Sequence, residues 1–179
     1  TFPIDINTFE FVLVTPRAVK YLWHKTSPEG LYGIEKKRAI VPGSLMDGIS
    51  YGSGRPYSYW LVVDPMNRRQ QVSIDVGDVD IELYQFDHAN KCYNLCIDAE
   101  YAIIQGAMFW QNKVTKAVIC DRPVLIESML DCYDMKTNRN VYCRKTLPVQ
   151  SSTRLKEAIR QATTEEEIFK VQRMAWAER

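Results

Sequence analysis

The sequence lacks the long apolar run that a membrane-spanning helix requires, and it lacks an excess of charge of either sign. A spanning helix needs about 20 consecutive apolar residues, and no stretch of the 179 residues comes near that length. Lys and Arg number 23 against 22 Asp and Glu, a net charge of +1. Capture of nucleic acid by charge alone needs a concentrated positive field. We therefore expect no membrane contact, and contact with RNA only through a local groove.

Paired cysteines are also missing. The five cysteines stand at positions 92, 96, 120, 132 and 143, an odd number without a CxxC pair, which does not indicate a disulfide framework. The first residues, Thr1-Phe2-Pro3, do not show the charged-then-apolar profile of a secretion signal. Both observations predict a reducing, intracellular location, cytoplasmic or nuclear.

The spacing of the potential zinc ligands does not fit a zinc site. His88, Cys92 and Cys96 carry suitable ligand atoms, but steps of four residues bring side chains close together only on a helix. Residues 93–97 have the composition of a strand instead. We expect no metal.

What the sequence does contain is a succession of short β-prone runs with few helical segments between them. These runs cover residues 9–14, 19–26, 57–63, 79–83, 93–97, 107–110, 116–120 and 124–128. Strand following strand predicts an α+β fold with a largely antiparallel sheet. Ser27 and Pro28 predict a helix over 28–38, and the Gly-rich and Ser-rich residues 47–56 predict an exposed loop.

The C-terminal part has a different pattern. Leu155, Ile159 and Ala162 predict a helix over 152–162, and Thr164 with Glu167 forms a capping-box pattern that opens a second helix. We therefore divide the chain into a domain over 1–150 and a helical appendage over 151–179. The apolar stripe of these helices packs on the domain itself or contacts a partner.

Several segments stand in the order found in a known fold. They are Leu22-Trp23-His24-Lys25-Thr26, then Gly33-Ile34, then Gly52-Ser53-Gly54-Arg55-Pro56 before Tyr59-Trp60-Leu61-Val62-Val63-Asp64, then Gly106-Ala107-Met108-Phe109-Trp110-Gln111-Asn112-Lys113-Val114. Over roughly residues 20–128 the chain resembles ADP-ribosyltransferases, above all RNA 2′-phosphotransferases and the catalytic domains of poly(ADP-ribose) polymerases. The resemblance implies a split antiparallel sheet around a pocket for NAD.

The resemblance also implies which residues contact NAD. His24 would hydrogen-bond the ribose, with backbone groups of Lys25 and Thr26 beside the nicotinamide. Tyr51 would stack on the nicotinamide. Apart from the resemblance, Ser53 with Gly52 and Gly54 could offer backbone N–H groups of the loop to a phosphate. The alternatives from the residues alone are a strand-end histidine with ordinary hydrogen bonds and a packed loop tyrosine.

Catalysis would fall to His24, Arg55 and Gln111. The Arg55 guanidinium can hold a pyrophosphate or an RNA phosphate with forked geometry, and we expect it to converge with the His24 imidazole on one cleft. Gln111 stands where many polymerases have Glu. A solvated loop arginine and a surface glutamine are the alternatives.

Departures from the family pattern leave the function open. Lys25 replaces the family glycine, and the amide of Gln111 cannot act as a general base. One hypothesis is an NAD-dependent transferase acting on an RNA 2′-phosphate, a nucleic-acid end or a protein. The phosphate is favoured because it is already anionic. The others are a module that has lost catalysis and binds RNA or protein, and an assembly domain that uses its terminal helices.

Overall fold

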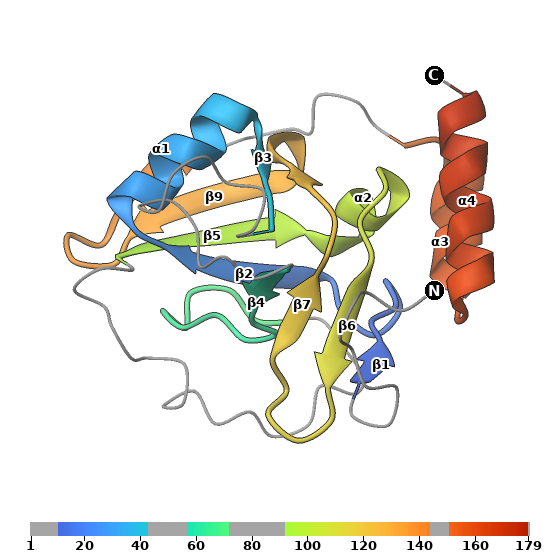
Figure 1. The fold of residues 1–179 in the computed structure, drawn as a ribbon, viewed down its shortest axis with the longest axis horizontal. Coiled ribbons are helices and arrows are strands. Elements are labelled where there is room, and N and C mark those ends of the chain that lie inside the picture. The colour runs from blue at the N-terminus through green and yellow to red at the C-terminus, as the bar shows by residue number, and fades with distance from the viewer. Residues whose placement is uncertain (1–10, 43–56, 72–91, 144–150, 179) are drawn as a thin grey trace.

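The computed structural model describes residues 11–42, 57–71, 92–143 and 151–178. Its elements follow one another along the chain as Figure 1 shows. They are β1 (Phe11–Leu13), β2 (Tyr21–Thr26), α1 (Pro28–Lys37), β3 (Ala39–Ile40), β4 (Ser58–Trp60), β5 (Tyr93–Asp98), α2 (Ala99–Ile104), β6 (Phe109–Asn112), β7 (Val118–Cys120), β8 (Val124–Leu125), the 3-10 helix η3 (Ile126–Ser128), β9 (Met129–Asp134), β10 (Arg139–Cys143), α3 (Thr153–Gln161) and α4 (Glu165–Ala177).

The strands form two four-stranded antiparallel sheets and one small pair. One sheet has the order β1-β6-β7-β4 and the other the order β10-β9-β5-β2, while β3 pairs with β8. The larger sheets meet where β2 passes β4. There the backbones of Trp23 and Leu61 exchange two hydrogen bonds of 3.0 and 2.7 Å between N and O. The predicted α+β class with antiparallel sheets is confirmed.

The β2–β5–β9 sheet is buried on both faces, by a different cluster of side chains on each. Side chains alternate along a strand, so Leu22 of β2 and Leu95 and Ile97 of β5 point into the main core, which α1 and α2 help to close. Trp23 points the other way and packs with Leu61 and Cys96 in a smaller cluster. Both faces of this sheet therefore contribute apolar side chains to the interior.

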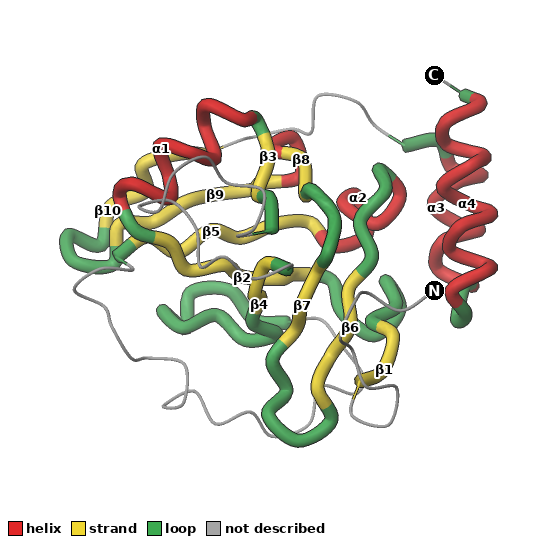
Figure 2. Tube along the Cα trace, in the orientation of Figure 1, coloured by secondary structure: helices red, strands yellow, loops and turns green. Residues whose placement is uncertain are grey.

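The two C-terminal helices begin where the capping residues predict. The Ser152 hydroxyl accepts from Leu155 N at 3.2 Å and the Thr164 hydroxyl from Glu167 N at 3.2 Å. Figures 1 and 2 show α3 and α4 side by side at one end of the molecule, next to α2. Their apolar stripe joins the main core, and the Gln172 amide donates to the Ile103 and Ala107 carbonyl oxygens at 2.8 and 3.0 Å.

The strand predictions hold with local differences. The run over 124–128 is not one strand, because β8 ends at Leu125 and η3 follows, with the Ser128 hydroxyl donating to Leu125 O at 2.6 Å. The expected strand over 107–110 begins two residues later, as β6. The predictions for 47–56 and 79–83 lie outside the described residues. No described helix is both long and apolar enough to cross a membrane.

Candidate functional site

His24 lies at the seam between the two large sheets. Its Nδ1 is 2.6 Å from the carbonyl oxygen of Tyr59, and its ring centroid is 5.0 Å from that of Trp60, with an interplanar angle of 42°. A carbonyl oxygen can only accept a hydrogen bond, so Nδ1 carries the hydrogen. In the neutral ring Nε2 is then an acceptor. The seam thus selects both the tautomer and the direction of the imidazole.

The aromatic platform beside His24 is held in place by its own contacts. The Trp60 indole nitrogen donates to the Ser58 hydroxyl at 2.8 Å, and its ring meets Phe109 edge-on at 5.6 Å. Trp60 is 1% exposed. Because Trp60 cannot turn without breaking these contacts, the half-buried His24 ring rests on a rigid surface.

The side chains of Lys25 and Thr26 lie on opposite faces of β2. Since side chains alternate along β2, Lys25 points to the face opposite His24, so its stem does not crowd the His24 ring. Thr26 is 6% exposed and lies under α1. A Cβ added at Gly30 would stand 2.0 Å from the Thr26 hydroxyl oxygen. Only glycine therefore lets α1 approach this end of β2 so closely.

Gln111 lies in β6, in the other sheet. It pairs with Val118 of β7, which in turn pairs with Trp60, so the three side chains share one face. Two strand spacings, about 10 Å, separate Gln111 from Trp60. The Gln111 amide donates to the Lys116 carbonyl oxygen at 3.2 Å. Gln111 therefore shares a face with the His24 platform and holds the β6–β7 hairpin.

The remaining predicted site residues are Tyr51, Ser53 and Arg55. They fall within 43–56, outside the described residues. The expected convergence of Arg55 with His24 stays a prediction.

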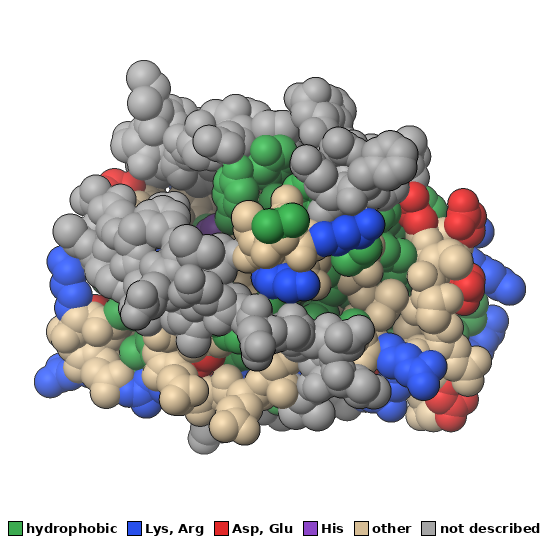
Figure 3. Space-filling model, turned by 90° about the horizontal axis from the view of Figure 1, so that it is seen from below, with side chains coloured by type: hydrophobic (Ala, Val, Ile, Leu, Met, Phe, Trp, Pro, Cys, Tyr) green, Lys and Arg blue, Asp and Glu red, His purple; other side chains and the backbone are tan. Residues whose placement is uncertain are grey.

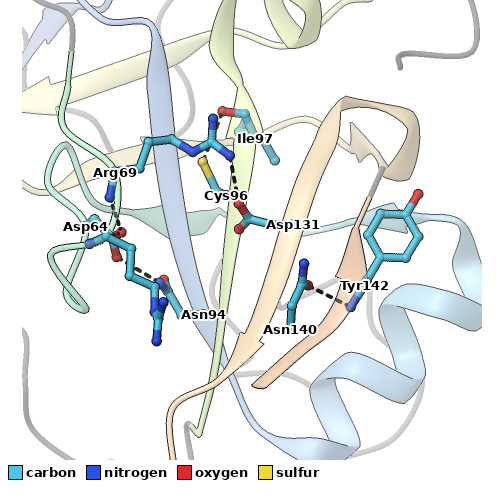
Figure 4. Close-up of polar contacts among 9 residues, drawn as sticks. Asp64, Arg69, Asn94, Cys96, Ile97, Asp131, Asn140 and Tyr142 are labelled. Carbon is cyan, nitrogen blue, oxygen red and sulfur yellow. Dashed lines mark hydrogen bonds and ion pairs between the residues drawn. The ribbon is translucent and has the colours of Figure 1, made fainter. Parts of the chain in front are cut away.

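A polar network that no sequence pattern above predicted lies on the opposite face of β2, centred on Asp64 (Figure 4). The Asp64 carboxylate accepts four hydrogen bonds of 2.9–3.0 Å, from the backbone N–H groups of Met66, Arg68 and Arg69 and from the Asn94 amide. Asp64 is 6% exposed. The tetrapeptide Asp64-Pro65-Met66-Asn67 is typical of a turn organised by an Asp side chain, and it is the signal that could have revealed this network.

Arg69 extends the network across the sheet to β9 (Figure 4). Its guanidinium is 2.9 Å from the Asp131 carboxylate and stacks over the Tyr21 ring at 4.9 Å. Burial raises the pKa of Asp131, and the hydrogen bond from Arg69 partly reverses that effect. Burial by itself would lower the pKa of Arg69, but the hydrogen bonds to Asp131 and Tyr21 raise it. The ion pair thus links the loop after β4 to strand β9.

The cysteine thiols are placed for packing. Cys92, Cys96, Cys120 and Cys132 are free and buried. Burial raises the pKa of Cys120 and of Cys132 to about 12, and raises that of Cys96 as well. Such thiols are poor nucleophiles at neutral pH. Within the described ranges, no three His, Cys, Asp or Glu side chains are grouped so as to hold a metal ion.

No protein-family model, curated protein or solved structure matches the chain.

Proposed function

We propose that the chain binds NAD on the His24 side of the sheet seam and transfers ADP-ribose to an acceptor. One observation supports this most: Tyr59 O orients the His24 ring at the end of β2, directly before the Ser27-capped helix α1. The resemblance to ADP-ribosyltransferases requires a histidine in this place between strand and helix. The antiparallel α+β class is observed. That the fold is the one found in ADP-ribosyltransferases is part of the proposal.

The His24 tautomer suits a ribose ligand. A ribose hydroxyl can donate to Nε2, while Tyr59 O keeps the ring from turning. In the transfer, an acceptor oxygen forms a bond to the ribose carbon as the bond to nicotinamide breaks and nicotinamide leaves with the electron pair. The developing oxocarbenium ion needs positioning and electrostatic stabilisation more than a strong base.

The nature of residue 111 favours one acceptor. An amide at Gln111 cannot remove a proton from a hydroxyl or an amine. An RNA 2′-phosphate needs no deprotonation, so it is the acceptor that this chain suits best, ahead of a protein side chain or a nucleic-acid end. The Lys and Arg side chains of the described residues are scattered over the face in Figure 3, which favours a locally bound RNA end over a long bound strand.

The test is NAD binding by calorimetry, followed by nicotinamide release in the presence of 2′-phosphorylated RNA. The variant is His24→Ala and the control Lys170→Ala, an exposed position on α4. We expect His24→Ala to weaken NAD binding at least about tenfold, equivalent to about 1.4 kcal/mol, and to abolish release. Lys170→Ala should match the unchanged protein. Unfolding curves of both variants verify that they are folded. Equal NAD affinity in a folded His24→Ala protein would refute the role of His24.

The second candidate is a module that binds without catalysis. The observation favouring it is the Gln111 amide, which donates to the Lys116 carbonyl oxygen and stands where many relatives by resemblance have a carboxylate. NAD binding with no release of nicotinamide would support this role.

Trp176 of α4 is 71% exposed and would be the contact for a protein partner or for assembly through the C-terminal helices. If the protein does not bind NAD, contact with a partner or assembly through these helices is the role that still stands.

A further inference from the structure

A groove of about 540 Å³ lies where the C-terminal helices meet the rest of the chain. It is bounded by residues 16–20, by the start of α2 and by α3. Its volume falls within the range of small-molecule sites. Lys20 directly precedes β2, so the groove lies about 13 Å along that strand from His24. It is a different place from the proposed NAD site.

The charges in the groove do not balance. Among the residues that the structure describes, four cationic side chains and two carboxylates line it. Arg160 and Glu100 form a forked pair, with 2.8 Å between Nε and Oε2 and 3.2 Å between Nη2 and Oε1. This pair neutralises itself. Within the described part of the chain, Arg17 and Lys156 form no ion pair.

The remaining carboxylate, Asp98, is already engaged. Its Oδ1 accepts from Tyr101 N at 2.9 Å and caps α2. Burial raises the pKa of this carboxyl. Among the described lining residues, Arg17, Lys20 and Lys156 therefore stand against one capping carboxylate, which is a positive excess. A positive excess in a concave site attracts anions.

Ser151 supplies a second, independent observation. Ser151 is one of the residues that line the groove, and its hydroxyl oxygen is buried without a hydrogen-bond partner in the described part of the chain. An unpartnered buried hydroxyl is unfavourable, and in native structures such groups usually have a partner. After rotation about its Cα–Cβ bond, this hydroxyl could donate to an anionic oxygen bound in the groove.

We propose that this groove binds a small phosphate-bearing ligand, up to the size of a mononucleotide. Arg17, Lys20 and Lys156 neutralise the phosphate and the Ser151 hydroxyl donates to it. Tyr101 and Ile104 supply an apolar part of the wall for a base or another uncharged group. The proposal stands independently of NAD binding at His24.

The probes are inorganic phosphate, AMP and adenosine, titrated by calorimetry at low salt. AMP should bind, phosphate should compete with it, and adenosine, which lacks the anion, should bind at least tenfold more weakly. Lys156→Glu and Arg17→Glu should each weaken AMP binding at least tenfold. Lys170→Glu, the same charge change outside the groove, should change it less than twofold.

Two further variants keep the test decisive. Asp98→Asn preserves a capping side chain and removes a negative charge, so it should tighten AMP binding several-fold, a gain that misfolding cannot produce. His24→Ala should leave AMP affinity unchanged, which separates this groove from the NAD site. AMP affinity that is the same in Lys156→Glu, Lys170→Glu and unchanged protein would overturn the proposal, as would adenosine binding as tightly as AMP.

Discussion

The two faces of β2 carry polar side chains under opposite conditions. On one face His24 contacts a backbone carbonyl through Nδ1 and rests on a tryptophan. On the other face Asp64 accepts four hydrogen bonds and Arg69 is braced by Asp131. A polar group whose bonding capacity is used within the chain stabilises the fold. An oriented ring with a second nitrogen acceptor is suited to a ligand. The position of a polar residue on a sheet therefore says less about its role than its partners do.

Replacing Asp64 should give the largest effect on this comparison. Asp64→Ala leaves three backbone N–H groups and the Asn94 amide without their acceptor in a buried place, and we expect a loss of about 3 kcal/mol in the free energy of unfolding. Asp134→Ala is the matched control, because Asp134 accepts from Lys136 N and Thr137 N in an exposed turn. It should cost about 1 kcal/mol. Urea unfolding measures both, and equal losses would contradict the structural role of Asp64.

Replacing Arg69 should have an intermediate effect. Arg69→Ala leaves the Asp131 carboxylate, whose side chain is 13% exposed, without its cation. Because the guanidinium is 39% exposed and partly screened by water, we expect about 1–2 kcal/mol of destabilisation at pH 7. Burial raises the folded pKa of Asp131, so its charged form is disfavoured in the folded state. The deficit should therefore shrink as the pH falls and Asp131 is protonated.

The double variant Arg69→Ala/Asp131→Asn supplies the control for this pair. Its loss of stability should be smaller than the sum of the two single losses, since removal of both charges leaves neither one unpaired. A pH-independent deficit in Arg69→Ala, or strictly additive losses, would show that the ion pair contributes nothing.

The smallest effect should come from Asp98, on the same face as Arg69 at the end of β5. Burial raises its pKa, which means that folding disfavours the carboxylate. Asn caps a helix as well as Asp does. Asp98→Asn should thus stabilise the protein by about 0.5 kcal/mol at pH 7. In the unchanged protein the penalty disappears below the unfolded pKa of about 4, so the difference between the two proteins should vanish in acid. A difference that grows as the pH falls would contradict this reasoning.

Helices with strong local signals were predictable, and the buried helix was not. Ser27 and Pro28 mark the start of α1, and Thr164 marks that of α4. The α2 segment has no apolar stripe to detect, because five of its six residues are buried, and a helix covered on all sides shows no amphipathic period. Its cap, Asp98, was the available signal.

The candidate site was predictable in part. His24 was singled out by a resemblance in the order of motifs, the helix after it was predicted from Ser27 and Pro28, and the NAD contacts stay a prediction. The hydrogen bond between His24 and Tyr59 joins residues 35 positions apart, and the Arg69–Asp131 pair joins residues 62 apart. Such contacts depend on the registers of several strands, which pairwise spacing along the chain does not reveal.

The sequence by itself determined where helices α1, α3 and α4 begin and that His24 and Lys25 point to opposite faces of one strand, because caps and strand alternation act over a few residues. Only the tertiary structure decided that Tyr59 orients the imidazole, that Asp64 gathers a loop beneath β2, and that Arg17, Lys20 and Lys156 share one groove. Those arrangements arise from packing between segments that are distant along the chain, and no local pattern encodes them.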